Sequence, residues 1–94
     1  MNLANAIVTI KMMPESPEVD LKGVEEKALA LIKEFNDESQ TRVSIEPVAF
    51  GLKSVNITFV MDESLGSPDV LEEKLAAIQG VNSAEVTDVR RAVG

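Results

Sequence analysis

Hydrophobic and polar residues alternate with a period of two along four stretches of the chain, and this alternation predicts β-strands. In the first stretch, Pro14 follows the last apolar position and ends the strand, because proline cannot donate to a β-ladder. In the last stretch the alternation slips at Asp88 and Val89, which indicates a β-bulge. The four predicted strands cover residues 4–12, 41–46, 55–59 and 81–89.

Two other stretches repeat their apolar residues every three or four positions, which predicts amphipathic helices. Asp20 caps the first helix, which is expected to end near residues 36–37. A loop over residues 61–66 leads to the second helix, where Ser67 is the cap and Pro68 occupies the first turn. Gly80 is expected to stop this helix. The apolar positions are Leu21, Val24, Ala28, Leu31 and Phe35 in the first helix and Val70, Leu71, Leu75 and Ile78 in the second.

The predicted order is strand, helix, strand, strand, helix, strand. Two strand-helix-strand units with right-handed crossovers give a four-stranded antiparallel sheet with both helices on one face. This is the ferredoxin-like α+β sandwich, and 94 residues are enough for a single domain covering 1–94. The other sheet face is expected to be open and of mixed polarity, with Ile7, Thr9, Lys11, Asn56, Thr58 and Val60 as its residues.

The stretch 47–53, Pro-Val-Ala-Phe-Gly-Leu-Lys, is predicted to be the tight corner of the central hairpin. Gly51 allows the backbone to turn where a side chain would clash. Phe50, beside that glycine, allows two interpretations. It either folds back onto the core, as large apolar residues usually do, or it is an exposed anchor for another protein.

The composition excludes several kinds of site. The chain has no cysteine and no histidine, so disulfides, thiolate metal sites and the commonest general base are all missing. The net charge of −7 opposes binding to nucleic acid overall and suits a basic partner surface. We find no apolar run long enough to span a membrane and no secretory signal. A cytoplasmic protein that is monomeric when free is therefore expected.

The candidate chemistry is equally restricted. The carboxylates Asp62, Glu63 and Asp69 show no recognisable metal-ligand spacing, and no nucleophile is paired with a base. An RNA-binding version of this fold stacks bases on aromatic residues of the central strands, and here only Phe59 is present there. We therefore expect no catalytic residue, metal or cofactor. A regulatory module that binds a small metabolite remains an open alternative to a protein-contact role.

Three segments resemble one known family, archaeal elongation factor 1-beta. The first segment is residues 13–21, Met-Pro-Glu-Ser-Pro-Glu-Val-Asp-Leu, the second is the corner 47–53, and the third is residues 88–94, Asp-Val-Arg-Arg-Ala-Val-Gly. The three segments occur in the family order, and the resemblance extends over essentially the whole chain. It implies a ferredoxin-like exchange factor that binds the GTPase elongation factor 1-alpha and promotes the replacement of GDP by GTP.

The resemblance also implies candidate partner-binding residues. The family's turn phenylalanine contacts the GTPase in eukaryotic relatives, and Phe50 occupies the matching position. The eukaryotic relatives end in a lysine-bearing tail, whereas this chain ends in Arg90-Arg91-Ala92-Val93-Gly94. Either an arginine replaces that lysine, or release works by shifting the phosphate-binding elements of the GTPase. The partner-binding candidates are Phe50, Gly51, Leu52, Lys53, Arg90 and Arg91.

Overall fold

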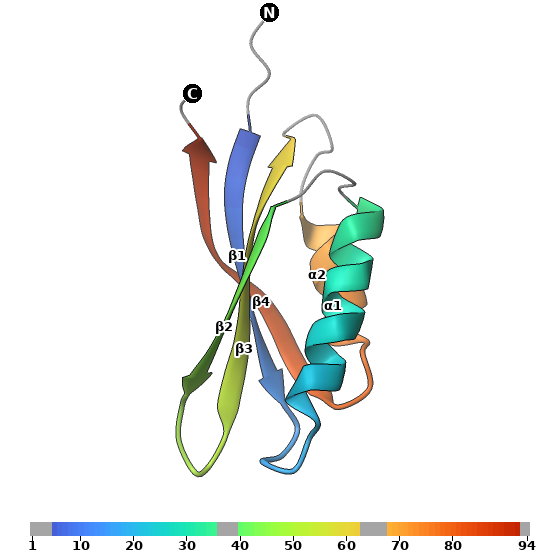
Figure 1. Cartoon of the computed structure of the whole chain (residues 1–94), viewed down its shortest axis with the longest axis vertical. Coiled ribbons are helices and arrows are strands. Elements are labelled where there is room, and N and C mark those ends of the chain that lie inside the picture. The colour runs from blue at the N-terminus through green and yellow to red at the C-terminus, as the bar shows by residue number, and fades with distance from the viewer. Residues whose placement is uncertain (1–4, 36–39, 63–67, 93–94) are drawn as a thin grey trace, which may run out of the picture.

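The computed structural model of the chain describes residues 5–35, 40–62 and 68–92. The four strands form one antiparallel sheet in the order β2-β3-β1-β4, and both helices pack on the same face (Figure 1). The ferredoxin-like prediction is therefore confirmed. The elements are β1 (Asn5–Pro14), α1 (Leu21–Phe35), β2 (Thr41–Pro47), β3 (Lys53–Asp62), α2 (Asp69–Ala76) and β4 (Val81–Ala92).

The core lies between the helices and the two central strands, β1 and β3. Alternate residues of each strand are buried, as the period of two predicts. Phe59 of β3 is fully buried and is the largest side chain in this core. The other fully buried apolar residues are Val8, Ile10, Met12, Ala28, Ile32, Val55, Ile57, Met61, Leu71 and Leu75.

The start of α1 follows the sequence prediction at Asp20. The backbone carbonyl of Asp20 accepts a hydrogen bond from the N–H of Val24 at 3.1 Å, which is the first bond of the helix. A Cβ atom on Gly23 would lie 2.9 Å from Oδ2 of Asp20. The glycine therefore leaves room for the Asp20 carboxylate beside the first turn.

The bounds of several elements differ from the prediction, and one residue of α2 faces outward. Strand β1 continues to Pro14 and β4 continues to Ala92. Strand β3 runs to Asp62 instead of ending before residue 61, because β1 pairs with it from Val55 to Asp62, where Asn5 faces Asp62. Helix α2 ends at Ala76, four residues before Gly80, which has a φ of +95° and turns the chain into β4. Val70 is 56% exposed and does not belong to the buried face of α2.

Two further predictions fall on residues outside the described ranges. They concern the end of α1 at residues 36–37 and the cap at Ser67. Among the described residues, Pro68 occupies the N-cap position of α2 and makes no side-chain cap bond.

The predicted bulge in β4 is confirmed. Thr9 of β1 faces Asp88, whereas the next residue, Ile10, faces Val86, so Thr87 is the extra residue. Beside the bulge, the carboxylate of Glu72 in α2 accepts a hydrogen bond from the N–H of Val86 at 2.7 Å. This bond ties the helix to the outer edge of β4.

The Glu72→Ala variant should therefore be less stable than the unmodified chain. Loss of a charge-assisted bond to a backbone N–H is expected to lower the free energy of unfolding by about 1–2 kcal/mol. Chemical denaturation measures this change, and the exposed neighbour Glu73, changed to Ala, provides the control. Equal effects of the two substitutions would show that the bond to Val86 contributes nothing.

Candidate partner-binding site

The corner between β2 and β3 is a tight turn of defined geometry. The N–H of Leu52 donates to the carbonyl of Ala49 at 2.9 Å, and the N–H of Val48 donates to the carbonyl of Leu52 at 2.9 Å. The two central residues, Phe50 and Gly51, have φ angles of +55° and +79°. Positive φ at both central positions is the signature of a type I′ turn, which matches the twist of a hairpin.

Phe50 is the unusual residue of this turn. Among the described residues it is the only non-glycine residue with a positive φ, a conformation that costs a bulky residue roughly 1–2 kcal/mol. Its side chain is 95% exposed, so the interpretation that it folds back onto the core is wrong. The chain therefore holds a large aromatic ring in water at a position where asparagine or glycine would be more favourable.

The residues that precede Phe50 in the sequence are also apolar and partly exposed. Val48 is 47% exposed and Ile45 is 43% exposed. A Cβ atom on Gly51 would lie 3.6 Å from Cγ of Pro17, so the turn lies beside the connection between β1 and α1. This end of the molecule thus presents an apolar tip. Figure 1 shows the β2–β3 turn and the β1–α1 connection at this same end.

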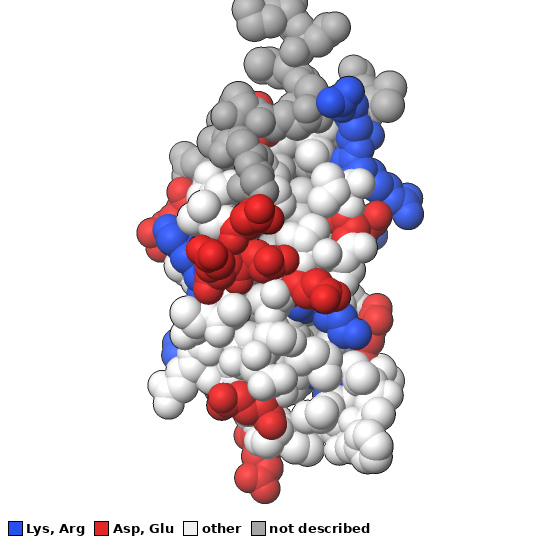
Figure 2. All heavy atoms as spheres, turned by 180° about the vertical axis from the view of Figure 1, so that it is seen from behind, with Lys and Arg blue, Asp and Glu red and all other residues white. Residues whose placement is uncertain are grey.

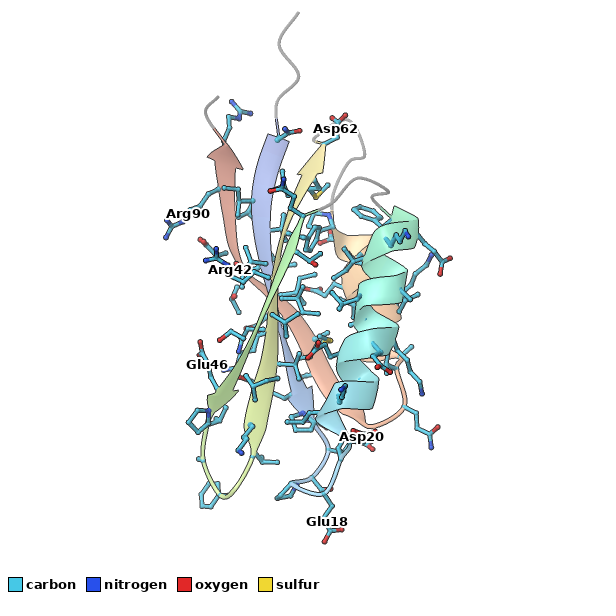
Figure 3. The ribbon with its side chains drawn as sticks, in the orientation of Figure 1. Glu18, Asp20, Arg42, Glu46, Asp62 and Arg90 are labelled. Atoms are coloured by element: carbon cyan, nitrogen blue, oxygen red, sulfur yellow. The ribbon has the colours of Figure 1, made fainter. Side chains whose placement is uncertain are left out.

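The arginine pair lies at the other end of the sheet. Arg90 faces Ile7, and Arg91 faces Ala6, near the start of β1, whereas the turn extends from the opposite ends of β2 and β3. Figure 3 shows Arg90 at the upper end of β4, away from the turn. The length of β3 separates the two groups by about 30 Å, at about 3.3 Å per residue.

The charges near Arg90 are exposed. Its Nε atom lies 2.9 Å from Oδ2 of Asp88, with side chains that are 75% and 45% exposed, so the pair contributes little to stability. Figure 2 shows Lys and Arg side chains gathered at the upper right of the rear face and Asp and Glu side chains across its middle. The C-terminal end of β4 is therefore a local basic region on an acidic protein.

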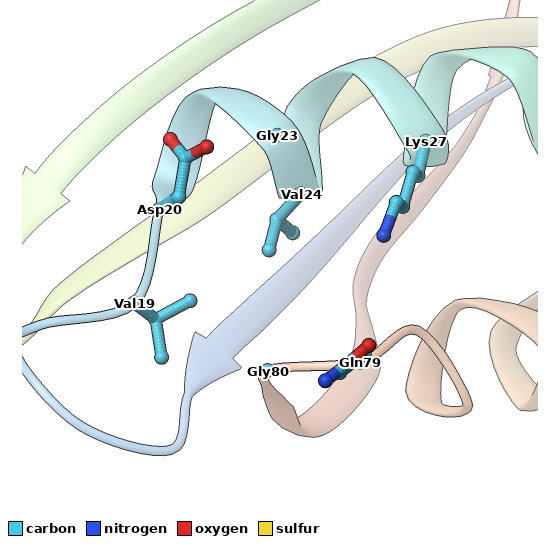
Figure 4. A pocket seen from close by; sticks show the side chains of 7 residues that line it. All are labelled: Val19, Asp20, Gly23, Val24, Lys27, Gln79 and Gly80. Atoms are coloured by element: carbon cyan, nitrogen blue, oxygen red, sulfur yellow. The ribbon is translucent and has the colours of Figure 1, made fainter.

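A shallow pocket of about 250 Å³ lies between the start of α1 and the chain preceding β4 (Figure 4). The carboxylate of Asp20 points away from Gln79 and Gly80, while Val24 and Lys27 lie along the same wall. This volume is below the ~300–1,000 Å³ of typical small-molecule sites. Two other open depressions are larger, at about 370 Å³ between α1 and α2 and about 420 Å³ beside β4.

The described residues lack two features that other classes of protein require. No described helix is long and apolar enough to cross a membrane. Within residues 5–35, 40–62 and 68–92, no group of three or more acidic, histidine or cysteine side chains is placed to hold a metal ion.

Comparison with known proteins gives first the fold class and then the family. The designed protein Foldit4 superposes on this chain with a TM-score of 0.64, and the superposition covers 96% of this chain and 98% of Foldit4. The two sequences are only 16% identical, so this similarity is evidence for the fold alone. Residues 7–92 match the family described as the EF-1 guanine nucleotide exchange domain. The chain belongs to this family, which places it among the nucleotide exchange factors of translation elongation.

Curated relatives extend over nearly the whole chain. Elongation factor 1-beta of Methanothermobacter thermautotrophicus is 39% identical over 89 residues, covering 95% of this chain and 98% of the relative. The protein of the same name from Methanosphaera stadtmanae gives the same identity and coverage. That of Methanococcus maripaludis strain C5 is 40% identical over 87 residues, covering 93% and 97% of the two chains. These matches agree with the resemblance noted in the sequence and favour an exchange factor over a metabolite-binding module.

Proposed function

We propose that this protein promotes the exchange of GDP for GTP on elongation factor 1-alpha by binding the GTPase and weakening its hold on GDP. Phe50 is the main anchor, with Gly51, Leu52 and Lys53 beside it, and Arg90 and Arg91 contribute a second contact. The protein acts through binding, so the reaction requires no catalytic acid or base from this chain.

The physical basis of such exchange is linkage between two binding equilibria. A factor that binds the nucleotide-free GTPase more tightly than the GDP-bound form must weaken GDP binding by the same ratio. What the factor needs is a stable frame and a rigid contact. The packed core between the sheet and the two helices provides the stable frame. The hydrogen-bonded turn between β2 and β3 provides the rigid contact.

The observation that carries the proposal is the state of Phe50. An aromatic ring that is 95% exposed, on a turn whose φ angle is unfavourable for it, has no folding role that would account for its presence. Buried aromatic anchors supply much of the energy of small protein interfaces. Membership of the exchange-domain family supports a GTPase of translation elongation as the partner of this anchor.

The positions of the two candidate groups constrain the partner. A GTPase that contacts both Phe50 and the arginine pair must extend about 30 Å along the sheet. The apolar tip is suited to a hydrophobic recess, and the arginines are suited to an acidic surface. The two contacts are therefore expected to fall on separate patches of the partner.

Linkage gives a direct test. Titration calorimetry of this protein with elongation factor 1-alpha is expected to give a lower Kd for the nucleotide-free form than for the GDP-bound form. The ratio of these constants should equal the ratio by which saturating factor raises the Kd for GDP. Equal affinity for both forms of the GTPase would rule out the proposed mechanism.

The arginine pair carries its own prediction. Changing both Arg90 and Arg91 to Ala should weaken binding to the GTPase roughly threefold to tenfold, mainly through slower association, and the difference should shrink at high salt. Stopped-flow association at two ionic strengths measures this effect. Arg42→Ala, which removes an exposed arginine from β2, is the control. Identical rates for all three proteins would place the pair outside the interface.

A further inference from the structure

The two outer edges of the sheet are built differently. Edge strands present unpaired backbone groups that can pair with another chain, and proteins usually block them. On β4, the bulge at Thr87 interrupts the edge, and the carboxylate of Glu72 accepts the bond from the N–H of Val86. That edge is therefore partly closed.

Among the residues that the structure describes, the edge formed by β2 has no bulge and no helix carboxylate bonded to its backbone; its blocking features are the charged residues Arg42 and Glu46 and the terminal Pro47. Its register with β3 is continuous from Thr41 to Pro47, without a bulge. Every residue of the strand is exposed except Val43, which is half-buried. Because β2 ends the strand order, its outer side faces none of the other strands in residues 5–35, 40–62 and 68–92.

The hydrogen-bond pattern identifies which backbone groups face outward. The N–H of Val60 donates to the carbonyl of Gln40 at 3.4 Å, and the N–H of Val48 donates to the carbonyl of Leu52 at 2.9 Å. Hydrogen-bonded pairs recur at every second residue of an antiparallel ladder, so the even-numbered residues of β2 bond to β3. The odd-numbered residues direct their N–H and C=O groups away from the sheet. These residues are Thr41, Val43 and Ile45, together with the carbonyl of Pro47.

When β2 is paired antiparallel with β2 of a second copy of the chain, one register brings complementary side chains opposite each other. With Ser44 opposite Ser44 of a second copy, Arg42 of each strand lies opposite Glu46 of the other. Figure 3 shows Arg42 and Glu46 on the same side of β2, one toward each end. In the same register Val43 lies opposite Ile45, and both carry outward backbone groups, so they form the hydrogen-bonded pairs.

This register is also the one with the greatest overlap. It pairs the whole segment Thr41–Pro47, whereas a shift of two residues in either direction loses pairs at the ends and separates Arg42 from Glu46. At the ends, the N–H of Thr41 meets the carbonyl of Pro47. Pro47 has no N–H to offer the carbonyl of Thr41, so each end pair forms one hydrogen bond instead of two, while pairing to β3 is unaffected because Pro47 is an outward-facing position.

We infer that β2 is a self-association edge, at which two copies of this chain pair antiparallel about Ser44 into one continuous sheet. The two-fold axis stands perpendicular to the sheet, so the helices of both copies lie on the same face. Ile45, 43% exposed in the single chain, is then covered by the partner strand. Two ion pairs and two apolar pairs define the contact.

The interface is small. Two seven-residue strands bury little surface in comparison with the roughly 1,200–2,000 Å² of stable complexes. The dimer should therefore form reversibly and grow with protein concentration, while dilute solutions hold the monomer that the sequence leads us to expect. Phe50 lies three residues beyond the paired segment, so self-association is a property separate from the proposed exchange activity.

Cysteine cross-linking tests the register, since the full chain has no cysteine of its own. Ser44→Cys is expected to form a covalent dimer rapidly under mild oxidation, because the facing residues form a close, non-hydrogen-bonded pair. Arg42→Cys and Glu46→Cys should each cross-link slowly alone and rapidly when mixed in equal amounts. Equal rates for all four samples would indicate random collision and overturn the inference.

Charge reversal provides a second test in the chain without cysteines. Sedimentation velocity over a range of concentrations should show weaker self-association for Arg42→Glu, and recovery in the double variant Arg42→Glu with Glu46→Arg. Lys11→Glu, the same charge change on a central strand, is the control and should leave self-association unchanged. A chain that stays monomeric at all concentrations, or a double variant that does not recover, would contradict the inference. The exchange assay on these variants reports separately on the proposed function.

Discussion

The Phe50→Asn variant is expected to be more stable than the unmodified chain and much less active in nucleotide exchange. Asparagine tolerates a positive φ, and Asn-Gly is the preferred central pair of a type I′ turn. Removing the unfavourable aromatic residue should raise the free energy of unfolding by about 0.5–1 kcal/mol. Losing the anchor should slow stimulated GDP release roughly thirtyfold, which corresponds to about 2 kcal/mol of interface energy.

Thermal unfolding and fluorescent GDP release measure the two effects on the same sample. Phe50→Ala is the matched control, since it removes the ring and keeps a residue that is unfavourable at this φ of +55°. It should remain folded, with nearly unchanged stability, and lose as much exchange activity as the Asn variant. Full activity in either variant would remove Phe50 from the interface. Unfolding of the Ala variant would mean that the ring supports the fold.

Phe59→Ala is expected to have the opposite profile, with a large loss of stability. Phe59 is fully buried between the sheet and the helices, and truncating a buried phenylalanine typically costs about 3–5 kcal/mol. A domain of 94 residues has about 5–14 kcal/mol of total stability, so this single change removes a large share of it. The variant should unfold at a much lower temperature or be unfolded at 25 °C.

Chemical denaturation of the two alanine variants, Phe50→Ala and Phe59→Ala, measures this contrast directly. The same residue type is replaced by the same residue in both, so the difference between them reports burial alone. Similar stabilities would contradict the assignment of one ring to the surface and the other to the core.

The fold could be predicted from the sequence because its signals are local. Period-two alternation, the cap at Asp20 and the turn glycine Gly51 each act within a few residues. The predicted ends of β3 and α2 were wrong because contacts with neighbouring elements determine where these two elements end. Strand β3 continues to Asp62 because β1 pairs with it, and Gly80 follows a tight turn after α2, in which the N–H of Ile78 donates to the carbonyl of Leu75.

The candidate site was less predictable. Residue type made Phe50 a candidate, but its exposure depends on whether the turn reaches back over the core, which the sequence does not determine. The placement of Arg90 and Arg91 at the far end follows from the register of β4 against β1, where Ile7 meets Arg90. Register is a long-range property, and only the structure revealed that the two candidate groups are far apart. The self-complementary spacing of Arg42 and Glu46 became meaningful only once β2 was seen to be an edge.

The most direct test of the exchange function is the release of fluorescent GDP from the cognate elongation factor 1-alpha, with excess unlabelled nucleotide, in the presence and absence of this protein. We expect release to accelerate at concentrations of the protein well below that of the GTPase, because each molecule acts on many GTPases in turn. Unchanged release, with a folded protein and an active GTPase, would contradict the account.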